Sequence, residues 1–321
     1  MNIYHICFLQ RNIYCHNKHT IAGNIRRQTI NTKPIVKETH MSNNTIALAG
    51  GVAMPLVGFG TWQITGSDCT RCVQEAIACG YRLIDTAQIY GNEAQVGEAL
   101  RTCGVSREQL FVTTKIWFRN FEADKALESA HESLRKLGTD YVDLLLLHWP
   151  FGNTYAAWRV QEKLLKDGKA RAIGVSNFAP SQLVDIIEFN AVVPAVNQVE
   201  THLLAQQAEL ATLMQRKGVA HQAYSPLGSG RARAMFDAPA VQAAAAAHGK
   251  TPAQIALRYL VQRGISVIPK TTHVERMREN IAVLDFQLTD AEMQALAALD
   301  TGTPIIGLPQ DGARAEAAMR W

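Results

Sequence analysis

Polar residues stand at or just after the ends of apolar runs in this chain. Asp85 ends one run, Lys115 ends the next, and His148 ends the one after that. Tyr90 follows Asp85 by five residues. A lysine ammonium group beside a tyrosine favours the phenolate and should lower the phenol pKa below its ordinary value of ~10, which makes the tyrosine an efficient proton donor. The set therefore predicts reduction of a carbonyl group, with Tyr90 as general acid and His148 polarising the oxygen.

Acyl transfer and metal chemistry fit these four residues poorly. Acyl transfer would need a serine or cysteine activated by a neighbouring base, and a metal centre would need partner ligands for His148 at usable spacing. Neither pattern is present, so no metal is predicted. Taken singly, Asp85 could cap a loop, Lys115 could form an ion pair, and His148 and Tyr90 could be core residues. Their joint placement at successive strand ends favours catalysis.

The elements that must position these residues alternate in type. Residues 45–49 and 52–57, split by Gly50-Gly51, predict a β-hairpin. Strand and helix then alternate over a length typical of one closed α/β fold, a (β/α)8 TIM barrel, in which the carboxyl ends of the strands share one face. The expected strands are apolar runs, as in buried parallel sheets: 57–61, 82–86, 110–115, 142–148, 172–176, 195–199, 220–225 and 266–269.

The helical patterns mostly end at a glycine, which can stop a helix in the left-handed conformation. The expected helices are 69–78, 93–102, 122–136, 155–166, 206–217 and 253–262, with two extra segments at 274–283 and 290–299. The tail from Asp300 is expected to fold over one end of the barrel. Cys69, Cys72 and Cys79 fit one face of the first helix, which favours core thiols over a zinc or redox site. Thiols of this kind suggest a reducing, cytoplasmic compartment.

Charge divides the 321 residues into two parts. Residues 1–40 carry six lysines and arginines against one acidic residue, whereas residues 41–321 carry 26 basic and 27 acidic residues. The second part is predicted to be a single barrel without a nucleic-acid surface. The first is predicted to be a disordered or non-native extension ahead of Met41; its arginines also suggest a mitochondrial presequence. No apolar run is long enough for a membrane span.

A nucleotide site is predicted after the last strand. The dinucleotide fingerprint G-x-G-x-x-G is absent, because Gln63 stands where the third glycine would follow Gly58 and Gly60. Lys270 instead ends the last apolar run, and Arg276 opens the helix after it. Cations beside a helix N-terminus suit a phosphate monoester such as that of NADPH, although a solvated basic helix start is the alternative.

The motifs closely resemble those of the aldo-keto reductases, in order from about Thr45 to Leu299. They read GFGTW at 58–62, DTAQIYGNE at 85–93, TK at 114–115, LHWP at 147–150, IGVSNF at 173–178, NQVE at 197–200, AYSPLG at 223–228 and IPK at 268–270. The small bacterial-type members, such as 2,5-diketo-gluconate reductases, are closest in appearance because the C-terminal loop is short.

The resemblance implies a role for each matching residue. The catalytic tetrad would be Asp85, Tyr90, Lys115 and His148. The NADPH site would be formed by Ser176, Asn177, Gln198, Tyr224, Ser225, Leu227, Gly228, Lys270, Thr271, Arg276, Glu279 and Asn280. The substrate pocket would be lined by Trp62, Trp117 and Trp149. The substrate would be a small carbonyl compound, with keto-sugars and α-keto carbonyls among the candidates, and the chain is expected to be a monomer.

Two departures from the family pattern concern the loops that choose the substrate. Many relatives carry His-Pro after the Gln-Val-Glu motif, but here His202 is followed by Leu203, and the tail at 303–309 is largely apolar. Two other functions also remain open on this sequence. One is a non-catalytic, nucleotide-sensing binding protein on the same barrel. The other is an NAD-linked alcohol dehydrogenase, against which Lys270 and Arg276 argue.

Overall fold

The computed structural model describes residues 44–230, 233–306 and 311–320, and its centre is a barrel of eight parallel strands. The strands follow one another around the barrel in chain order, and a parallel bridge between Val57 and Val267 joins the first to the last. The predicted TIM barrel is therefore confirmed. Its strands are β3 (Gly58–Gly60), β4 (Leu83–Asp85), β5 (Phe111–Ile116), β6 (Val142–Leu147), β7 (Ala170–Ser176), β8 (Val196–Glu200), β9 (Ala220–Tyr224) and β10 (Ser266–Val267).

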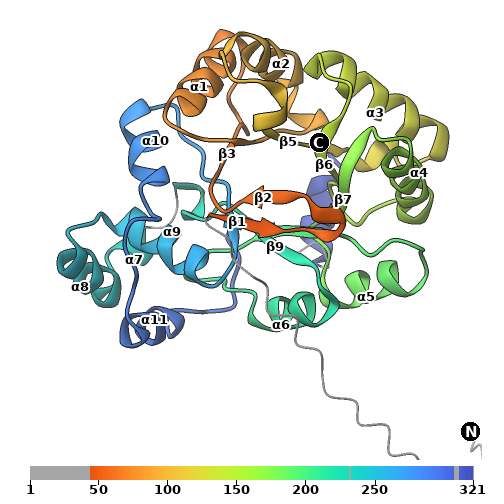
Figure 1. Cartoon of the computed structure of the whole chain (residues 1–321). Helices are drawn as coiled ribbons and strands as arrows, with labels where there is room; N and C mark the ends of the chain where they lie inside the picture. The colour runs from red at the N-terminus through yellow and green to blue at the C-terminus, as the bar shows by residue number, and fades with distance from the viewer. Residues whose placement is uncertain (1–43, 231–232, 307–310, 321) are drawn as a thin grey trace, which may run out of the picture. The chain divides into compact units, whose positions relative to one another are not determined.

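Helices surround the strands as a ring (Figure 1). Every residue of β5 and β6 is buried, because one face of each strand meets the barrel interior and the other meets these helices. The helices in chain order are α1 (Gly66–Ala78), α2 (Glu93–Thr102), α3 (Ala123–Leu137), α4 (Thr154–Lys166), α5 (Pro180–Glu188), α6 (Ala208–Lys217), α7 (Arg233–Phe236), α8 (Pro239–His248), α9 (Pro252–Gln262), α10 (Val274–Ile281), α11 (Asp290–Ala297) and α12 (Gly312–Ala318).

Four of these helices were not expected from the sequence: α5, α7, α8 and α12. The helix α8 contains five successive alanines, so its sequence has no clear apolar period. The helices α5, α7 and α12 are short, with nine, four and seven residues. A helix of four residues has too few turns to show a period. Length does not explain why α5 was missed, because α10 and α11 have eight residues each and were expected.

The hairpin of β1 (Thr45–Ala47) and β2 (Ala53–Pro55) lies across one end of the barrel (Figure 1). Its register pairs Ile46 with Met54, and both side chains are buried in the core. The Ser266 hydroxyl, at the start of β10, donates a hydrogen bond to the carbonyl of Pro55 at 2.9 Å. The hairpin therefore covers the end at which the strands begin, and leaves the carboxyl ends of the strands for a site.

Two sequence predictions about α1 and α3 are confirmed. Cys69 and Cys72 are free thiols buried on α1, as core residues should be, whereas Cys79 follows the helix and is half-buried against the core. Gly138 ends α3 in the left-handed conformation, with φ of 63°, and donates its N–H to Arg135 at 3.2 Å. The expectation for residues 1–40 lies outside the described residues.

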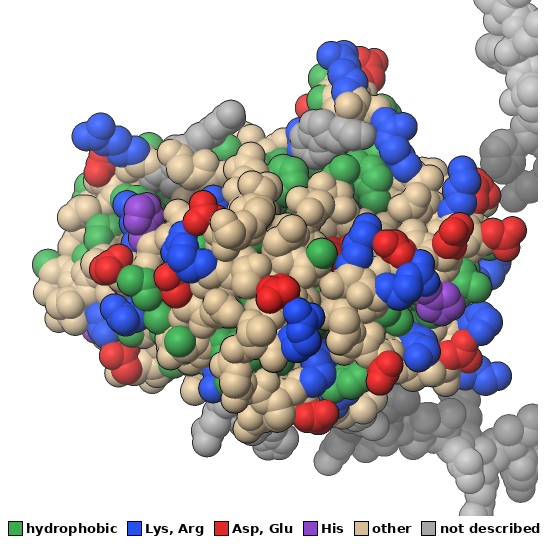
Figure 2. Space-filling model, turned by 90° about the horizontal axis from the view of Figure 1, so that it is seen from above, with side chains coloured by type: hydrophobic (Ala, Val, Ile, Leu, Met, Phe, Trp, Pro, Cys, Tyr) green, Lys and Arg blue, Asp and Glu red, His purple; other side chains and the backbone are tan. Residues whose placement is uncertain are grey.

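The surface and the helices bear on possible partners. Figure 2 shows basic and acidic side chains interspersed over one face, as the near-neutral charge of residues 41–321 predicts. In the part of the chain that the structure describes, no helix combines the length and the apolar composition needed to cross a bilayer.

Candidate active site

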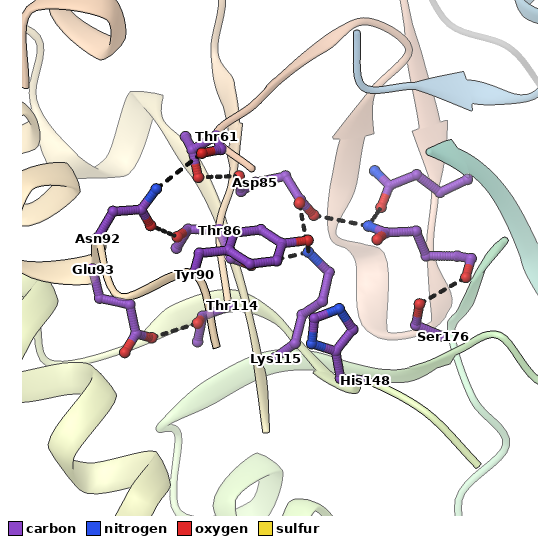
Figure 3. A network of polar contacts seen from close by, with 12 residues as sticks. Thr61, Asp85, Thr86, Tyr90, Asn92, Glu93, Thr114, Lys115, His148 and Ser176 are labelled. Atoms are coloured by element: carbon purple, nitrogen blue, oxygen red, sulfur yellow. Dashed lines mark hydrogen bonds and ion pairs between the residues drawn. The ribbon is translucent and has the colours of Figure 1, made fainter. Parts of the chain in front are cut away.

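The four predicted catalytic residues lie together at the carboxyl ends of neighbouring strands (Figure 3). Asp85 ends β4, Lys115 lies near the end of β5, and His148 directly follows β6. Tyr90 belongs to a single 3-10 turn, Gln88–Tyr90, which follows β4. The Lys115 Nζ atom lies 2.5 Å from Asp85 Oδ1 and 3.4 Å from Tyr90 Oη. The rings of Tyr90 and His148 meet edge to face, with centroids 5.6 Å apart.

Asp85 and Lys115 form an ion pair that is shielded from solvent. Their side chains are 2% and 0% exposed. Lys115 also donates to the Thr86 carbonyl at 3.0 Å, and the second oxygen of Asp85 accepts from Gln198 Nε2 at 2.8 Å. Burial lowers the pKa of Lys115, and the charge of Asp85 opposes that effect. Each member of the ion pair therefore has a further hydrogen-bond partner, which is the Thr86 carbonyl for Lys115 and Gln198 for Asp85.

The pKa of Tyr90 contradicts the expectation drawn from the sequence. Burial is the main influence and raises this pKa well above its ordinary value, and the charge of Asp85 raises it further. The expected lowering by Lys115 fails because its ammonium group is paired with Asp85 at 2.5 Å, whereas the phenol lies at 3.4 Å. Tyr90 therefore keeps its proton at neutral pH.

His148 is a neutral imidazole in this setting. Burial first and the charge of Lys115 second hold its pKa well below the ordinary value. Its backbone carbonyl accepts from Asn177 Nδ2 at 3.0 Å, whereas its Nδ1 atom has no hydrogen-bond partner among the described residues. A neutral imidazole carries one N–H, which can be donated to an oxygen placed beside it.

A second set of buried polar residues, which was not expected from the sequence, holds the loop that carries Tyr90. Asn92 accepts a hydrogen bond from the Thr86 hydroxyl at 2.7 Å and donates to the Thr61 carbonyl at 2.9 Å. The Thr114 hydroxyl donates to Glu93 Oε1 at 2.6 Å, and burial raises the pKa of Glu93. Figure 3 shows these contacts on the side of Tyr90 away from Ser176. A signal was present, since Asn92 and Glu93 stand in the motif around Tyr90.

The residues expected to hold nicotinamide lie at the ends of β7, β8 and β9. The Ser176 hydroxyl donates to the Gln198 carbonyl at 2.8 Å, and Tyr224 Oη donates to Asn177 Oδ1 at 2.7 Å. Gln222 was not expected from the sequence, yet it accepts from Gln198 Nε2 at 2.7 Å. The alternation of strand side chains would have found it, because Gln222 stands two residues before Tyr224 and so shares its face.

The residues expected to hold the phosphates follow β9 and β10. Ser225 has a positive φ of 48° and precedes Leu227 and Gly228 in the loop after β9, where Gly228 begins a 3-10 turn. Lys270 and Arg276 are exposed near the N-terminus of α10, and neither forms an ion pair with any residue that the structure describes. Thr271 is buried beside them.

The two residues expected near adenine, Glu279 and Asn280, lie at the other end of α10. The Glu279 carboxylate accepts a hydrogen bond from the Thr251 hydroxyl. Asn280 is buried. Because Glu279 already has a partner in this structure, its carboxylate is partly committed before any ligand binds.

The three tryptophans expected around a substrate divide into two groups. The Trp62 ring lies 4.7 Å from the Tyr90 ring, and the Trp117 ring lies 5.3 Å from the His148 ring. Trp149 instead stacks on Phe151, with an interplanar angle of 6° and 5.6 Å between centroids. The Arg314 guanidinium of α12 covers Trp149 at 5.2 Å. The tail thus folds over this end of the barrel, as expected.

Comparisons with known proteins agree with this geometry. The model of the aldo/keto reductase family matches residues 56–301. Morphine 6-dehydrogenase of Pseudomonas putida is 44% identical over 280 residues, which are 83% of this chain and 94% of that protein. A 9,11-endoperoxide prostaglandin H2 reductase of Trypanosoma cruzi is 40% identical over 270 residues, covering 84% and 95%. A crystal structure of an aldo-keto reductase from a Medee basin deep-sea metagenome library superposes with a TM-score of 0.81 at 38% identity, covering 83% of this chain and 99% of that one.

Proposed function

This chain belongs to the aldo/keto reductase family of oxidoreductases, which act on carbonyl compounds, and on that premise we propose that it reduces an aldehyde or a ketone to an alcohol with NADPH. Tyr90 is the proton donor in this proposal. The observation that carries it is the buried Asp85–Lys115 pair, whose ammonium group lies 3.4 Å from the Tyr90 hydroxyl beside a neutral His148.

Each catalytic residue has a distinct task in this reaction. NADPH, when bound, supplies a hydride to the carbonyl carbon. The His148 N–H holds the carbonyl oxygen, and Tyr90 gives its proton to that oxygen as negative charge builds there. Lys115, held by Asp85, then faces the phenolate that remains. A phenol with a raised pKa is a weaker acid, yet it can still give its proton to an alkoxide, which is a far stronger base than a phenolate.

The residues around the barrel end fit a phosphorylated dinucleotide. Lys270 and Arg276 are exposed cations without an acidic partner in the described ranges, near the N-terminus of α10, and this arrangement suits the 2′-phosphate of NADPH. The Tyr224 ring at the end of β9 would stack on nicotinamide. The remaining contacts are assigned, as part of the proposal, to Ser176, Asn177, Gln198, Ser225, Leu227, Gly228, Thr271, Glu279 and Asn280.

We propose a small carbonyl compound as the substrate. Trp62 and Trp117 lie beside Tyr90 and His148, and we assign them with Trp149 to the substrate pocket. One relative is a morphine 6-dehydrogenase and another is a 9,11-endoperoxide prostaglandin H2 reductase. A test panel should therefore include larger compounds as well as small aldehydes. We further propose a monomer in a cytoplasmic compartment, which the free thiols of Cys69 and Cys72 favour.

The direct test is the loss of NADPH absorbance with the purified protein. The panel contains small aldehydes, α-keto compounds, keto-sugars and a polycyclic ketone, and each is also measured with Tyr90→Phe. Turnover that disappears in the variant would support the proposal. Bound NADPH without turnover on any compound would favour a nucleotide-sensing role instead.

A further inference from the structure

A C-terminal segment, residues 300–306, lies along the β8–α6 loop, residues 201–207. The backbone N–H of Thr301 donates to the Leu204 carbonyl at 3.0 Å, and that of Gln206 donates to Asp300 Oδ1 at 3.1 Å. The Gln206 side chain also donates to the Leu296 carbonyl at 3.0 Å. This segment is therefore attached beside the carboxyl end of β8, where Gln198 and Tyr224 also lie.

Glu200, the last residue of β8, makes the strongest of these attachments. Its Oε1 atom accepts from the backbone N–H of Ile305 at 2.6 Å, and its Oε2 atom accepts from that of Ile306 at 2.9 Å. The Glu200 side chain is 3% exposed. Hydrogen bonds to an ionised, buried acceptor are shorter and stronger than those between neutral groups.

His202 supplies the remaining donor. The backbone N–H of Leu204 donates to His202 Nδ1 at 3.2 Å, so the imidazole proton must be on Nε2. His202 Nε2 lies 3.1 Å from Glu200 Oε1 and donates to it. If residues 305–306 left, His202 would be the one donor among these that remained. The carboxylate thus favours the attached state, because most of its hydrogen bonds come from the backbone N–H groups of residues 305–306.

The same tail is attached at a second place, across the barrel end. The Arg314 guanidinium of α12 lies 5.2 Å from the Trp149 ring, which follows β6. The Arg119 guanidinium, after β5, donates to the Met319 carbonyl, and Ala318 is buried. Contacts to the ends of β5 and β6 on one side and of β8 on the other place the attachments around the end that carries Tyr90 and His148.

We propose that Glu200 is a positioning residue, which holds residues 305–306 so that the tail stays over the catalytic end and tightens substrate binding. The inference rests on the proposed function, because it takes the substrate to bind at that end. Glu200 and Tyr224 are register partners in the β8–β9 pair, and the Thr201 N–H donates to the Tyr224 carbonyl at 3.3 Å. Glu200 touches neither Tyr90 nor Lys115 in the described contacts, so it acts on binding rather than on hydride transfer.

The test compares two glutamates that both pair with a histidine. Glu200→Gln removes the charge at the tail contact and keeps the size of the side chain. The matched control is Glu292→Gln, because Glu292 pairs with His248 at 3.0 Å between α8 and α11. Glutamine also preserves the capping box that Glu292 forms with Thr289. For each variant we would measure KM and kcat with the best substrate, single-turnover hydride transfer at saturating substrate, and amide hydrogen exchange of the peptide that contains Ile305 and Ile306.

We expect Glu200→Gln to raise KM by about 10-fold, since charged hydrogen bonds to Ile305 and Ile306 are lost. The single-turnover rate should stay within about twofold of the wild-type value, because the reacting groups are unchanged. Exchange at the 305–306 amides should accelerate. Glu292→Gln should change none of these quantities.

A variant on the tail side makes the test independent of any damage to the barrel. Ile306→Pro removes one of the two backbone N–H groups that donate to Glu200, on a segment outside the strands. Its effect on KM should match that of Glu200→Gln, and the double variant should be no worse than either single one. Additive effects, or a Glu200→Gln variant that loses kcat while Ile306→Pro is normal, would show that Glu200 acts on Tyr224 instead and would overturn the proposal.

Failure of the proposed function would look different. In that case the wild-type protein would turn over nothing in the panel, but hydrogen exchange would still report on the attachment. Unchanged exchange at residues 305–306 in Glu200→Gln would refute the positioning role whether or not a substrate is known. Faster exchange together with an unchanged KM in an active enzyme would refute the link to binding.

Discussion

Two buried aspartates at opposite ends of the barrel are paired in different ways. Asp85, at the carboxyl end of β4, pairs with Lys115, whose side chain is fully buried and also lies 3.4 Å from Tyr90 Oη. Asp143, at the start of β6, binds Arg107 and Arg171, each at 2.8 Å, and accepts the Val112 N–H at 2.9 Å. Both arginines reach solvent, being 18% and 46% exposed.

The difference separates a site that can react from a site that stabilises the fold. Around Asp143, two guanidinium groups complete the hydrogen bonds of the carboxylate, and the Arg107 group also lies 4.2 Å from the Tyr141 ring. Around Asp85, the Lys115 amine is buried, and the longest of its hydrogen bonds is to the phenol of Tyr90, a titratable group. A buried ion pair contributes little net stability, so chemistry is the better explanation for the pair of Asp85 and Lys115.

The largest effect is expected from Tyr90→Phe. The variant removes the proposed proton donor and leaves the Asp85–Lys115 pair intact, so kcat should fall by about 10²-fold or more. The affinity for NADPH, followed by tryptophan fluorescence, should stay near the wild-type value. If Tyr90→Phe retained most of its turnover, Tyr90 would not be the proton donor.

A change at the other end should act on stability alone. Asp143→Asn removes the charge shared by Arg107 and Arg171, and we expect the free energy of unfolding to fall by about 2 kcal/mol. The value is modest because both arginines can turn to solvent. Urea denaturation would measure it, and kcat at 25 °C should not change. A loss of kcat in the folded variant would show that Asp143 also affects catalysis, and would contradict this prediction.

The arginines of the two ends should also differ in what they do. Arg276→Ala should weaken NADPH binding by about 10-fold, the scale of one charged hydrogen bond, and leave NADH binding unchanged. Arg171→Ala is the matched control, since its guanidinium is paired with Asp143. It should affect neither cofactor. Equal losses for NADPH and NADH in Arg276→Ala would contradict the 2′-phosphate assignment.

The smallest effect concerns the buried histidines of the barrel. Burial holds the pKa of His148 well below its ordinary value and lowers that of His221 to about 3, so the unfolded chain takes up protons first as the pH falls. Stability is therefore complete above about pH 6.5 and decreases below it. His221→Gln should reduce the loss of unfolding free energy between pH 7 and pH 5.8 by about 1 kcal/mol, measured by urea denaturation. An unchanged loss would mean that His221 is protonated in the folded state.

Much of the fold and of the site followed from local patterns. Nearly continuous apolar runs marked the eight strands, because strands buried on both faces have no polar alternation to keep. The polar residues at their ends then had to share one face, since parallel strands in one barrel point the same way. This common direction brings Asp85, Lys115 and His148 together, and the structure agrees.

The contacts that some strand residues make could not be predicted in this way. Gln222 and Glu200 lie on strands whose alternation was readable, but their partners are distant in sequence. Glu200 meets Ile305 and Ile306 more than a hundred residues later, and Gln222 meets Ser266 of β10 at 3.2 Å. No local period carries such information, because it depends on how the tail and the last strand close around the barrel.

The sequence by itself determined the barrel, the order of its strands and the residues that meet at their carboxyl ends, because these depend on periodicity and on the common direction of parallel strands. Only the tertiary structure decided the protonation of Tyr90. Its pKa depends on burial and on Asp85, and those influences exceed that of a lysine already paired. A pKa is a property of an environment, and the environment exists only when the chain has folded.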